Sequence, residues 1–224
     1  MCNMGNEERR ARFFMASLRT AGYTVAKKPL KIVVPWATTG ALPQGIAAML
    51  LGIFEQLGGE PAYRFALAPQ GWDMKADGVL VEFDEDLHFN RYRSHSLAVP
   101  WDSQLPWSEA YRSYAVDNED MCLKAGKYRG KWANPSSNRM FGGSDPEGIL
   151  GELGPSRWKQ RAIYDAIRDA YALYTPGVSL ARVSIHDEIG GLNVNTATRK
   201  EIPFDPAALR AFIEARTVPA ATGP

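Results

Sequence analysis

Two acidic residues, Glu82 and Asp84, interrupt the apolar run that begins at Val79, and a third, Asp73, lies just upstream. The dipeptide Asp77-Gly78 is favoured in two-residue type I′ turns, and such a turn places Asp73 opposite Glu82 on antiparallel strands. Directly opposed residues have Cβ atoms about 4.5–5.5 Å apart. We therefore expect the carboxylates of Asp73 and Glu82 on one face, with Asp84 one step along and Lys75 beside them.

Opposed carboxylates repel each other and need compensation. A divalent cation such as Mg²⁺ provides it, because Mg²⁺ accepts carboxylate oxygens at about 2.1 Å and keeps several waters. The predicted metal ligands are Asp73, Glu82 and Asp84. The alternative is a polar sheet face in water, on which Lys75 pairs with one acid. The spacing of the residues leaves both interpretations open.

The order of the elements between about residues 44 and 187 resembles that of a known nuclease core. An apolar helix is followed by a strand, an Asp on a second strand, a third strand reading "VEFDEDLH" (Val81 to His88), a helix and a further strand. This order and this motif resemble the PD-(D/E)XK, or restriction-endonuclease-like, nucleases, closest to their very-short-patch-repair-like branch. The resemblance implies an α/β fold with a central mixed sheet flanked by helices.

The resemblance also implies an activity. Members hydrolyse phosphodiester bonds with Mg²⁺ or Mn²⁺, so the expected substrate is nucleic acid, DNA in particular, and the expected setting is repair, restriction or defence. Asp73 and Glu82 match the two family acids, with the backbone carbonyl of Phe83 as a third ligand. Asp84 stands where many members have lysine and where this branch has aspartate. His88 matches the histidine of the branch.

The sequence departs from the family pattern at several points. No proline precedes Asp73, the gap to Glu82 is short, and Glu85 replaces a usual glycine. Without the family lysine, Lys75 or Lys159 must supply the positive charge. The catalytic candidates are Asp73, Lys75, Glu82, Asp84, His88 and Lys159. The missing lysine also favours an alternative: a catalytically inactive nucleic-acid-binding or assembly module on the same fold.

Basic residues occur with aromatic residues in three short segments. The net charge is only +1, so attraction to nucleic acid must come from local patches. In "KAGKYRGKW", "RYR" and "SRWKQR", cations are placed to contact phosphates and aromatic rings to stack on bases. An ordinary solvated surface is the alternative. The candidate nucleic-acid-binding residues are Arg91, Arg93, Lys124, Lys127, Tyr128, Arg129, Lys131, Arg157 and Arg161.

The cysteines and the N-terminal sequence point to a reducing, cytoplasmic setting. Cys2 and Cys122 form neither a disulfide framework nor a zinc motif. We expect no signal peptide and no membrane span. Expected partners are nucleic acid and either a second copy of the chain or a protein of a defence system.

We predict a single nuclease-like domain over residues 1–224. It comprises a helix at 6–21, the core at about 44–187, an irregular insertion at about 94–155 and a last helix at 205–216. Within the core the pattern predicts a buried helix at 45–59, a helix at 156–174, and strands at 31–36, 62–68 and 178–187.

Overall fold

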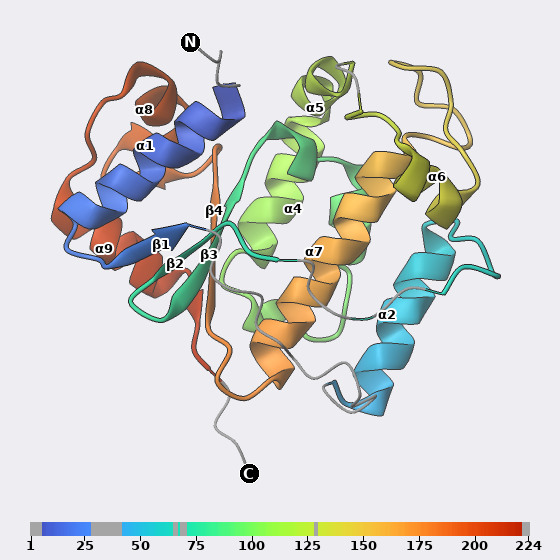
Figure 1. The fold of residues 1–224 in the computed structure, drawn as a ribbon, viewed down its shortest axis with the longest axis horizontal. Helices are drawn as coiled ribbons and strands as arrows, with labels where there is room; N and C mark the ends of the chain where they lie inside the picture. The colour runs from blue at the N-terminus through green and yellow to red at the C-terminus, as the bar shows by residue number, and fades with distance from the viewer. Residues whose placement is uncertain (1–5, 28–41, 65–66, 68–70, 128–129, 221–224) are drawn as a thin grey trace. The chain divides into compact units, whose positions relative to one another are not determined.

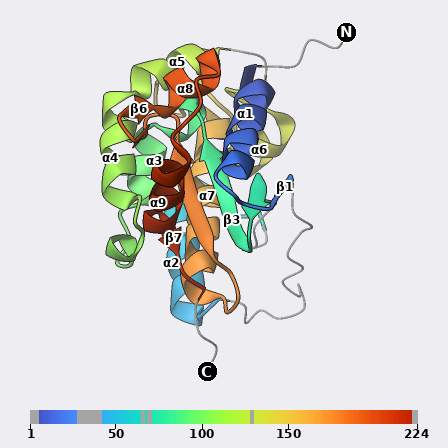
Figure 2. The ribbon, with the colours of Figure 1, turned by 90° about the vertical axis from the view of Figure 1, so that its left-hand side faces the viewer.

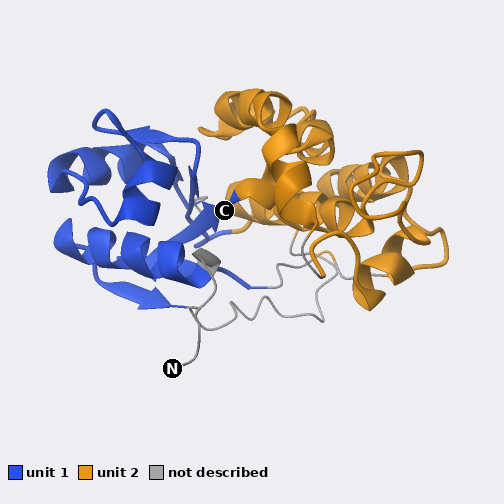
Figure 3. Ribbon diagram, turned by 90° about the horizontal axis from the view of Figure 1, so that it is seen from above, with its two compact units in different colours: residues 1–32, 71–85, 176–224 blue, residues 33–70, 86–175 orange. Residues whose placement is uncertain are grey.

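The computed structural model describes residues 6–27, 42–64, 67, 71–127 and 130–220. The chain divides into two compact units, coloured separately in Figure 3. Unit 1 comprises residues 1–32, 71–85 and 176–224, and unit 2 comprises residues 33–70 and 86–175. The mixed α/β class, with a mixed sheet flanked by helices, is confirmed. One domain over residues 1–224 stays a prediction, and the strand predicted at 31–36 lies outside the described residues.

Unit 1 contains a five-stranded sheet in the order β1-β2-β3-β4-β7. β1, β2 and β3 form an antiparallel meander, β4 runs parallel to β3, and β7 is antiparallel to β4. The parallel pair requires a long crossover, and residues 86–175 supply it. The strands are Val25–Lys27, Met74–Ala76, Val79–Asp84, Leu180–Ser184 and Thr217–Val218.

One face of this sheet is covered by helices α1 and α9, which lie side by side (Figures 1 and 2). The ring of Phe14 on α1 stacks on Phe83 of β3, with centroids 5.0 Å apart. Side chains alternate along a strand, so Glu82 and Asp84 point to the opposite face. The helix predicted at 6–21 is observed as α1, Asn6–Thr20, and the last helix as α9, Pro206–Ala215, capped by the side chain of Asp205.

Two smaller features complete unit 1. A two-stranded hairpin pairs β5, Glu188–Ile189, with β6, Leu192–Asn193. Helix α8, Val194–Lys200, follows at once and packs against α1. The side chain of Asn193 caps α8 by accepting the N–H of Thr196. These short elements make up most of the connection between β4 and α9.

Unit 2 is helical in its described residues, and the irregular insertion predicted at 94–155 is wrong for much of its length. Four short helices and a 3-10 turn span this region, and α6 has an Asn134 capping box with Pro135 at its first position. Proline and glycine between short helices concealed their periodicity. The elements are α2 (Gln44–Gln56), η1 (Asp86–His88), α3 (Arg91–Ser96), η2 (Asp102–Gln104), α4 (Ser108–Asp117), α5 (Glu119–Gly126), α6 (Pro135–Phe141) and α7 (Ser156–Tyr174).

Helix α7 is the centre of unit 2, and α2, α3 and α6 pack against it. Its bounds match the predicted helix, although Pro155 rather than Ser156 is the N-cap. Helix α2, predicted to be buried, is buried in part: Leu50, Ile53 and Phe54 are buried, but Met49 and Leu51 are each 43% exposed. Residues 62–64 form no strand. No helix of the described residues is long and apolar enough to cross a membrane.

Candidate functional site

The hairpin has the predicted register. Met74 pairs with Val81, Lys75 with Leu80 and Ala76 with Val79. Asp77 and Gly78 have φ angles of 46° and 103°, and a type I′ turn requires positive φ at both central residues. Asp73 and Glu82 therefore follow as the next opposed pair.

Asp73 and Glu82 are tied to each other through the backbone. The N–H of Asp73 donates to Oε1 of Glu82 at 3.2 Å, and the N–H of Phe83 donates to Oδ2 of Asp73 at 3.0 Å. Asp73 directly precedes β2, which begins at Met74. Its carboxylate therefore accepts a backbone N–H of β3 just outside the paired part of the hairpin. Asp73 is exposed and Glu82 is 3% exposed. Both carboxyl groups thus bind backbone N–H groups at the open end of the hairpin.

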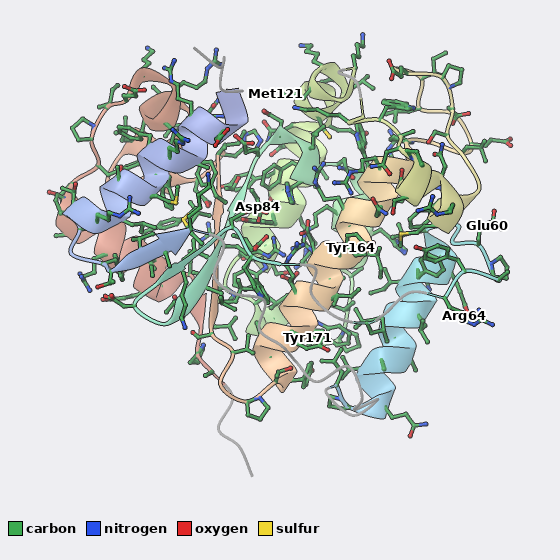
Figure 4. All side chains as sticks on the ribbon, in the orientation of Figure 1. Glu60, Arg64, Asp84, Met121, Tyr164 and Tyr171 are labelled. Carbon is green, nitrogen blue, oxygen red and sulfur yellow. The ribbon has the colours of Figure 1, made fainter. Side chains whose placement is uncertain are left out.

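A buried arginine supplies positive charge that sequence reasoning missed. Arg182 on β4 pairs in register with Glu82, and its Nη1 donates to Oδ2 of Asp84 at 2.7 Å. Arg182 and Asp84 are both fully buried; Asp84 is labelled at the end of β3 in Figure 4. Asp84 is therefore compensated by an arginine within the sheet, and a cation between Asp73 and Glu82 stays a prediction. The signal was an arginine inside the apolar strand "LARVS", because charged residues are rarely buried without a partner.

The metal-ligand set predicted from sequence is only partly suited to a cation. Asp84 is bonded to Arg182, and among the described residues Asp73, Glu82 and Asp84 do not form a group whose ligand atoms all lie within 4.8 Å. Asp73 and Glu82 remain a fitting pair of oxygen donors. Mg²⁺ is commonly bound by one or two carboxylates plus waters, so two acids at one edge suffice.

The two candidate lysines lie in different surroundings. Lys75 is exposed on β2, opposite Leu80, on the side of the strand that carries Asp73. Lys159 lies in unit 2 and is 8% exposed. Its Nζ is 5.7 Å from the ring centroid of Tyr92 and 5.8 Å from that of Phe141. Burial lowers the pKa of Lys159. Lys75 is thus the candidate cation that shares a unit with the acids.

His88 is held by a carboxylate that the sequence did not reveal. Its Nδ1 lies 2.7 Å from Oδ2 of Asp165, a fully buried residue of α7. The other carboxylate oxygen of Asp165 accepts from Arg168 at 3.2 Å. An ionised Asp165 accepts a hydrogen bond from Nδ1, and in the neutral imidazole this tautomer leaves Nε2 as the acceptor nitrogen. This orientation suits a general base.

Two of the candidate nucleic-acid-binding arginines are engaged within unit 2. Arg93 is 1% exposed, and its Nη2 donates to Oδ2 of the buried Asp169 at 2.8 Å, so the prediction that Arg93 contacts nucleic acid is corrected to a structural role. Arg91 is exposed and forms a two-pronged bond to Glu119, at 2.8 and 2.6 Å. This hydrogen bonding raises the pKa of Arg91 and lowers that of Glu119.

The other basic candidates lie around α5 and at the start of α7. Lys124 and Lys127 are exposed, and Lys131 is half-buried. Tyr128 and Arg129 lie outside the described residues. Trp132 is buried against Trp158, and its Nε1 donates to the carbonyl of Asp145 at 2.7 Å, so its ring does not stack on a base. Arg157 and Arg161 are half-buried on α7.

Cys122 is expected to be chemically inert in the folded protein. It is fully buried beside Leu87 and Trp158, and burial raises the pKa of its thiol to about 12. The reactive thiolate is therefore scarce at about pH 8. In a Cys2→Ser variant, a disulfide reagent should modify Cys122 only after denaturant is added. Rapid modification of the native protein would contradict this placement.

The comparisons with known proteins identify a family without an assigned activity. Searches of curated proteins and of solved structures gave no match. One family model matches residues 52–199, more than half of the chain, and it describes a family of unknown function, DUF7255. The matched segment includes the hairpin with Asp73 and Glu82, the His88–Asp165 pair and strand β4. The chain therefore belongs to the DUF7255 family.

Proposed function

We propose that this protein is a metal-dependent nuclease that hydrolyses phosphodiester bonds in nucleic acid, with DNA as the expected substrate. The observation that carries the proposal is the pair of carboxylate–backbone hydrogen bonds by which Asp73 and Glu82 are held at the open end of the β2–β3 hairpin. The helical crossover and the further strand that follow β3 also support the resemblance to restriction-endonuclease-like proteins. Three antiparallel strands in sequence are followed by a helical crossover and a strand parallel to the third.

The proposed roles follow from the chemistry of each side chain. Asp73 and Glu82 hold Mg²⁺ or Mn²⁺, which lowers the pKa of a bound water and stabilises charge on the phosphate. Exposed Lys75, on the same unit, offers a cation to the substrate phosphate. The resemblance gives His88 an acid–base role, and the contact of its Nδ1 with Asp165 orients the imidazole.

A second candidate function is a catalytically inactive module that binds nucleic acid or assembles with a protein. The Arg182–Asp84 ion pair favours it, because a carboxylate already neutralised by arginine has no need of a metal. In both cases we propose a cytoplasmic protein without a membrane partner, acting in DNA repair, restriction or defence. A second copy of the chain or a protein of a defence system is the proposed protein partner.

Cleavage assays separate the two functions. Purified protein is incubated with end-labelled single- and double-stranded DNA and RNA, in Mg²⁺, in Mn²⁺ and in EDTA. We expect cleavage with either metal and none in EDTA. Binding without cleavage under every metal condition supports the inactive module. Cleavage that persists in EDTA contradicts a metal-dependent site.

A further inference from the structure

Helix α7 begins with an unusual concentration of positive charge. Arg157, Lys159 and Arg161 occupy its first two turns, and its first turn contains no acidic residue. The N-terminus of a helix carries a partial positive charge, so cations there are unfavourable unless something anionic offsets them. Helix α7 has 19 residues, and its first N–H groups are already bonded, that of Ser156 to Ser144 Oγ and that of Arg157 to the carbonyl of Trp132.

The three cations differ in what surrounds them. Lys159 points between the rings of Tyr92 and Phe141, where cation–π contact stabilises its charge. Arg157 and Arg161 are four residues apart, so their side chains leave one side of the helix, one turn from each other. Lys159 is not part of this pair.

Arg157 and Arg161 lack the carboxylate partners that four other arginines of unit 2 have. Nη1 of Arg157 donates to Oε1 of Gln160, a neutral group, at 2.5 Å. Nη1 of Arg161 is buried and has no hydrogen-bond partner among the residues that the structure describes. In the same described part of the chain, neither arginine forms an ion pair. Arg91, Arg93, Arg112 and Arg168 each do.

The two charges also act on each other. Burial lowers the pKa of Arg157, and the positive charge of Arg161 lowers it further. The nearby Asp165 is already bonded to His88 and Arg168. A buried guanidinium donor without an acceptor carries a desolvation cost, which an anion with several acceptor oxygens removes.

We propose that Arg157 and Arg161 form a binding site for a phosphate group on α7. A guanidinium matches the oxygens of a phosphate with paired hydrogen bonds, and two of them neutralise a dianion. Tyr164, labelled on α7 in Figure 4, lies one turn beyond Arg161 on the same side of the helix. The site needs no metal. That the phosphate belongs to a nucleic-acid backbone rests on the proposed function; the site itself does not.

Inorganic phosphate tests the site directly. The full-length protein in EDTA is titrated with phosphate, against chloride at equal ionic strength, by calorimetry and by thermal unfolding. We expect saturable binding and a higher melting temperature for the wild type, and binding weaker by about tenfold or more in Arg161→Gln. Arg112→Gln is the matched control, because Arg112 on α4 is bonded to Asp102. It should bind phosphate as the wild type does.

Stability gives a second readout, because the difference in stability between wild type and Arg161→Gln should change sign when phosphate is added. Without phosphate, Arg161→Gln should be at least as stable as the wild type, because it removes a half-buried guanidinium whose Nη1 has no acceptor among the described residues. With saturating phosphate the order should reverse, because only the wild type gains stability by binding. Equal responses to phosphate in all three proteins, or no response beyond that to chloride, would overturn the site.

Oligonucleotides identify the source of the phosphate. In EDTA, Arg161→Gln should bind DNA more weakly and with a shallower dependence on salt, because fewer counterions are released. Arg112→Gln should not change. Phosphate binding that depends on Arg161, together with DNA binding that does not, would overturn the nucleic-acid assignment. Because no metal is present, neither result depends on whether the protein cleaves its substrate.

Discussion

Replacing Arg182 with methionine should lower the free energy of unfolding by about 3–5 kcal/mol, the usual cost of removing one partner from a buried ion pair. Arg182 and Asp84 are fully buried and bonded at 2.7 Å. The substitution leaves the Asp84 carboxylate in the interior without the guanidinium that neutralises it. Urea unfolding of wild type and variant measures the loss, provided that the free energy of unfolding depends on urea concentration with the same slope in both proteins.

The double variant distinguishes this charge effect from lost packing. The double variant Arg182→Met with Asp84→Asn has no Asp84 carboxylate left to be neutralised, so much of the lost stability should return. The two single effects should therefore not add, since contacting residues couple by about 0.5–3 kcal/mol. A loss below about 1 kcal/mol in Arg182→Met, or simple additivity in the cycle, would show that the pair contributes little.

Asp73→Asn and Glu82→Gln should each reduce the rate of cleavage by more than about 100-fold. Changing a residue that only hydrogen-bonds to a metal ligand typically costs about 10–100-fold in activity, and losing the ligand itself should cost more. Each replacement is nearly isosteric and keeps an oxygen that can accept the backbone N–H now bonded to the carboxylate. The fold and nucleic-acid binding should therefore be retained. Initial cleavage rates in Mg²⁺ and Mn²⁺, with circular dichroism of each variant, provide the measurement.

Glu109→Gln is the control for this experiment. Glu109 is an exposed acid of α4 in unit 2, so its removal changes the net charge equally without touching the hairpin. It should cleave at the wild-type rate. Activity that survives in Glu82→Gln would place the chemistry elsewhere in the protein, and the acids of β3 would then be structural.

Local signals in the sequence were sufficient to predict the hairpin and the longest helices. The turn at Asp77-Gly78 fixes the register within ten residues, and α7 and α9 show apolar periodicity between clear boundaries. Helices α4, α5 and α6 were not predicted, because each has ten residues or fewer and the loops between them contain proline, glycine and asparagine. Segments this short depend on tertiary packing more than on their own pattern.

The candidate site was predictable only where its residues are close in sequence. Asp73 and Glu82 are nine positions apart, and the turn alone brings them together. Arg182 is 98 positions from Asp84, and Asp165 is 77 positions from His88. No local pattern specifies such pairs, because the folding of the whole sheet or helix bundle forms them. The partner of a buried charge can therefore be identified only from the structure.

Metal binding by the wild type and by Glu82→Gln tests directly whether Asp73 and Glu82 hold a cation. Mn²⁺ is titrated into each protein without nucleic acid, and the bound ion is followed by electron paramagnetic resonance. We expect saturable binding to the wild type and to Glu109→Gln, and binding weaker by about tenfold or more in Glu82→Gln and Asp73→Asn. Identical titrations for all four proteins would contradict a metal site at the open end of the hairpin.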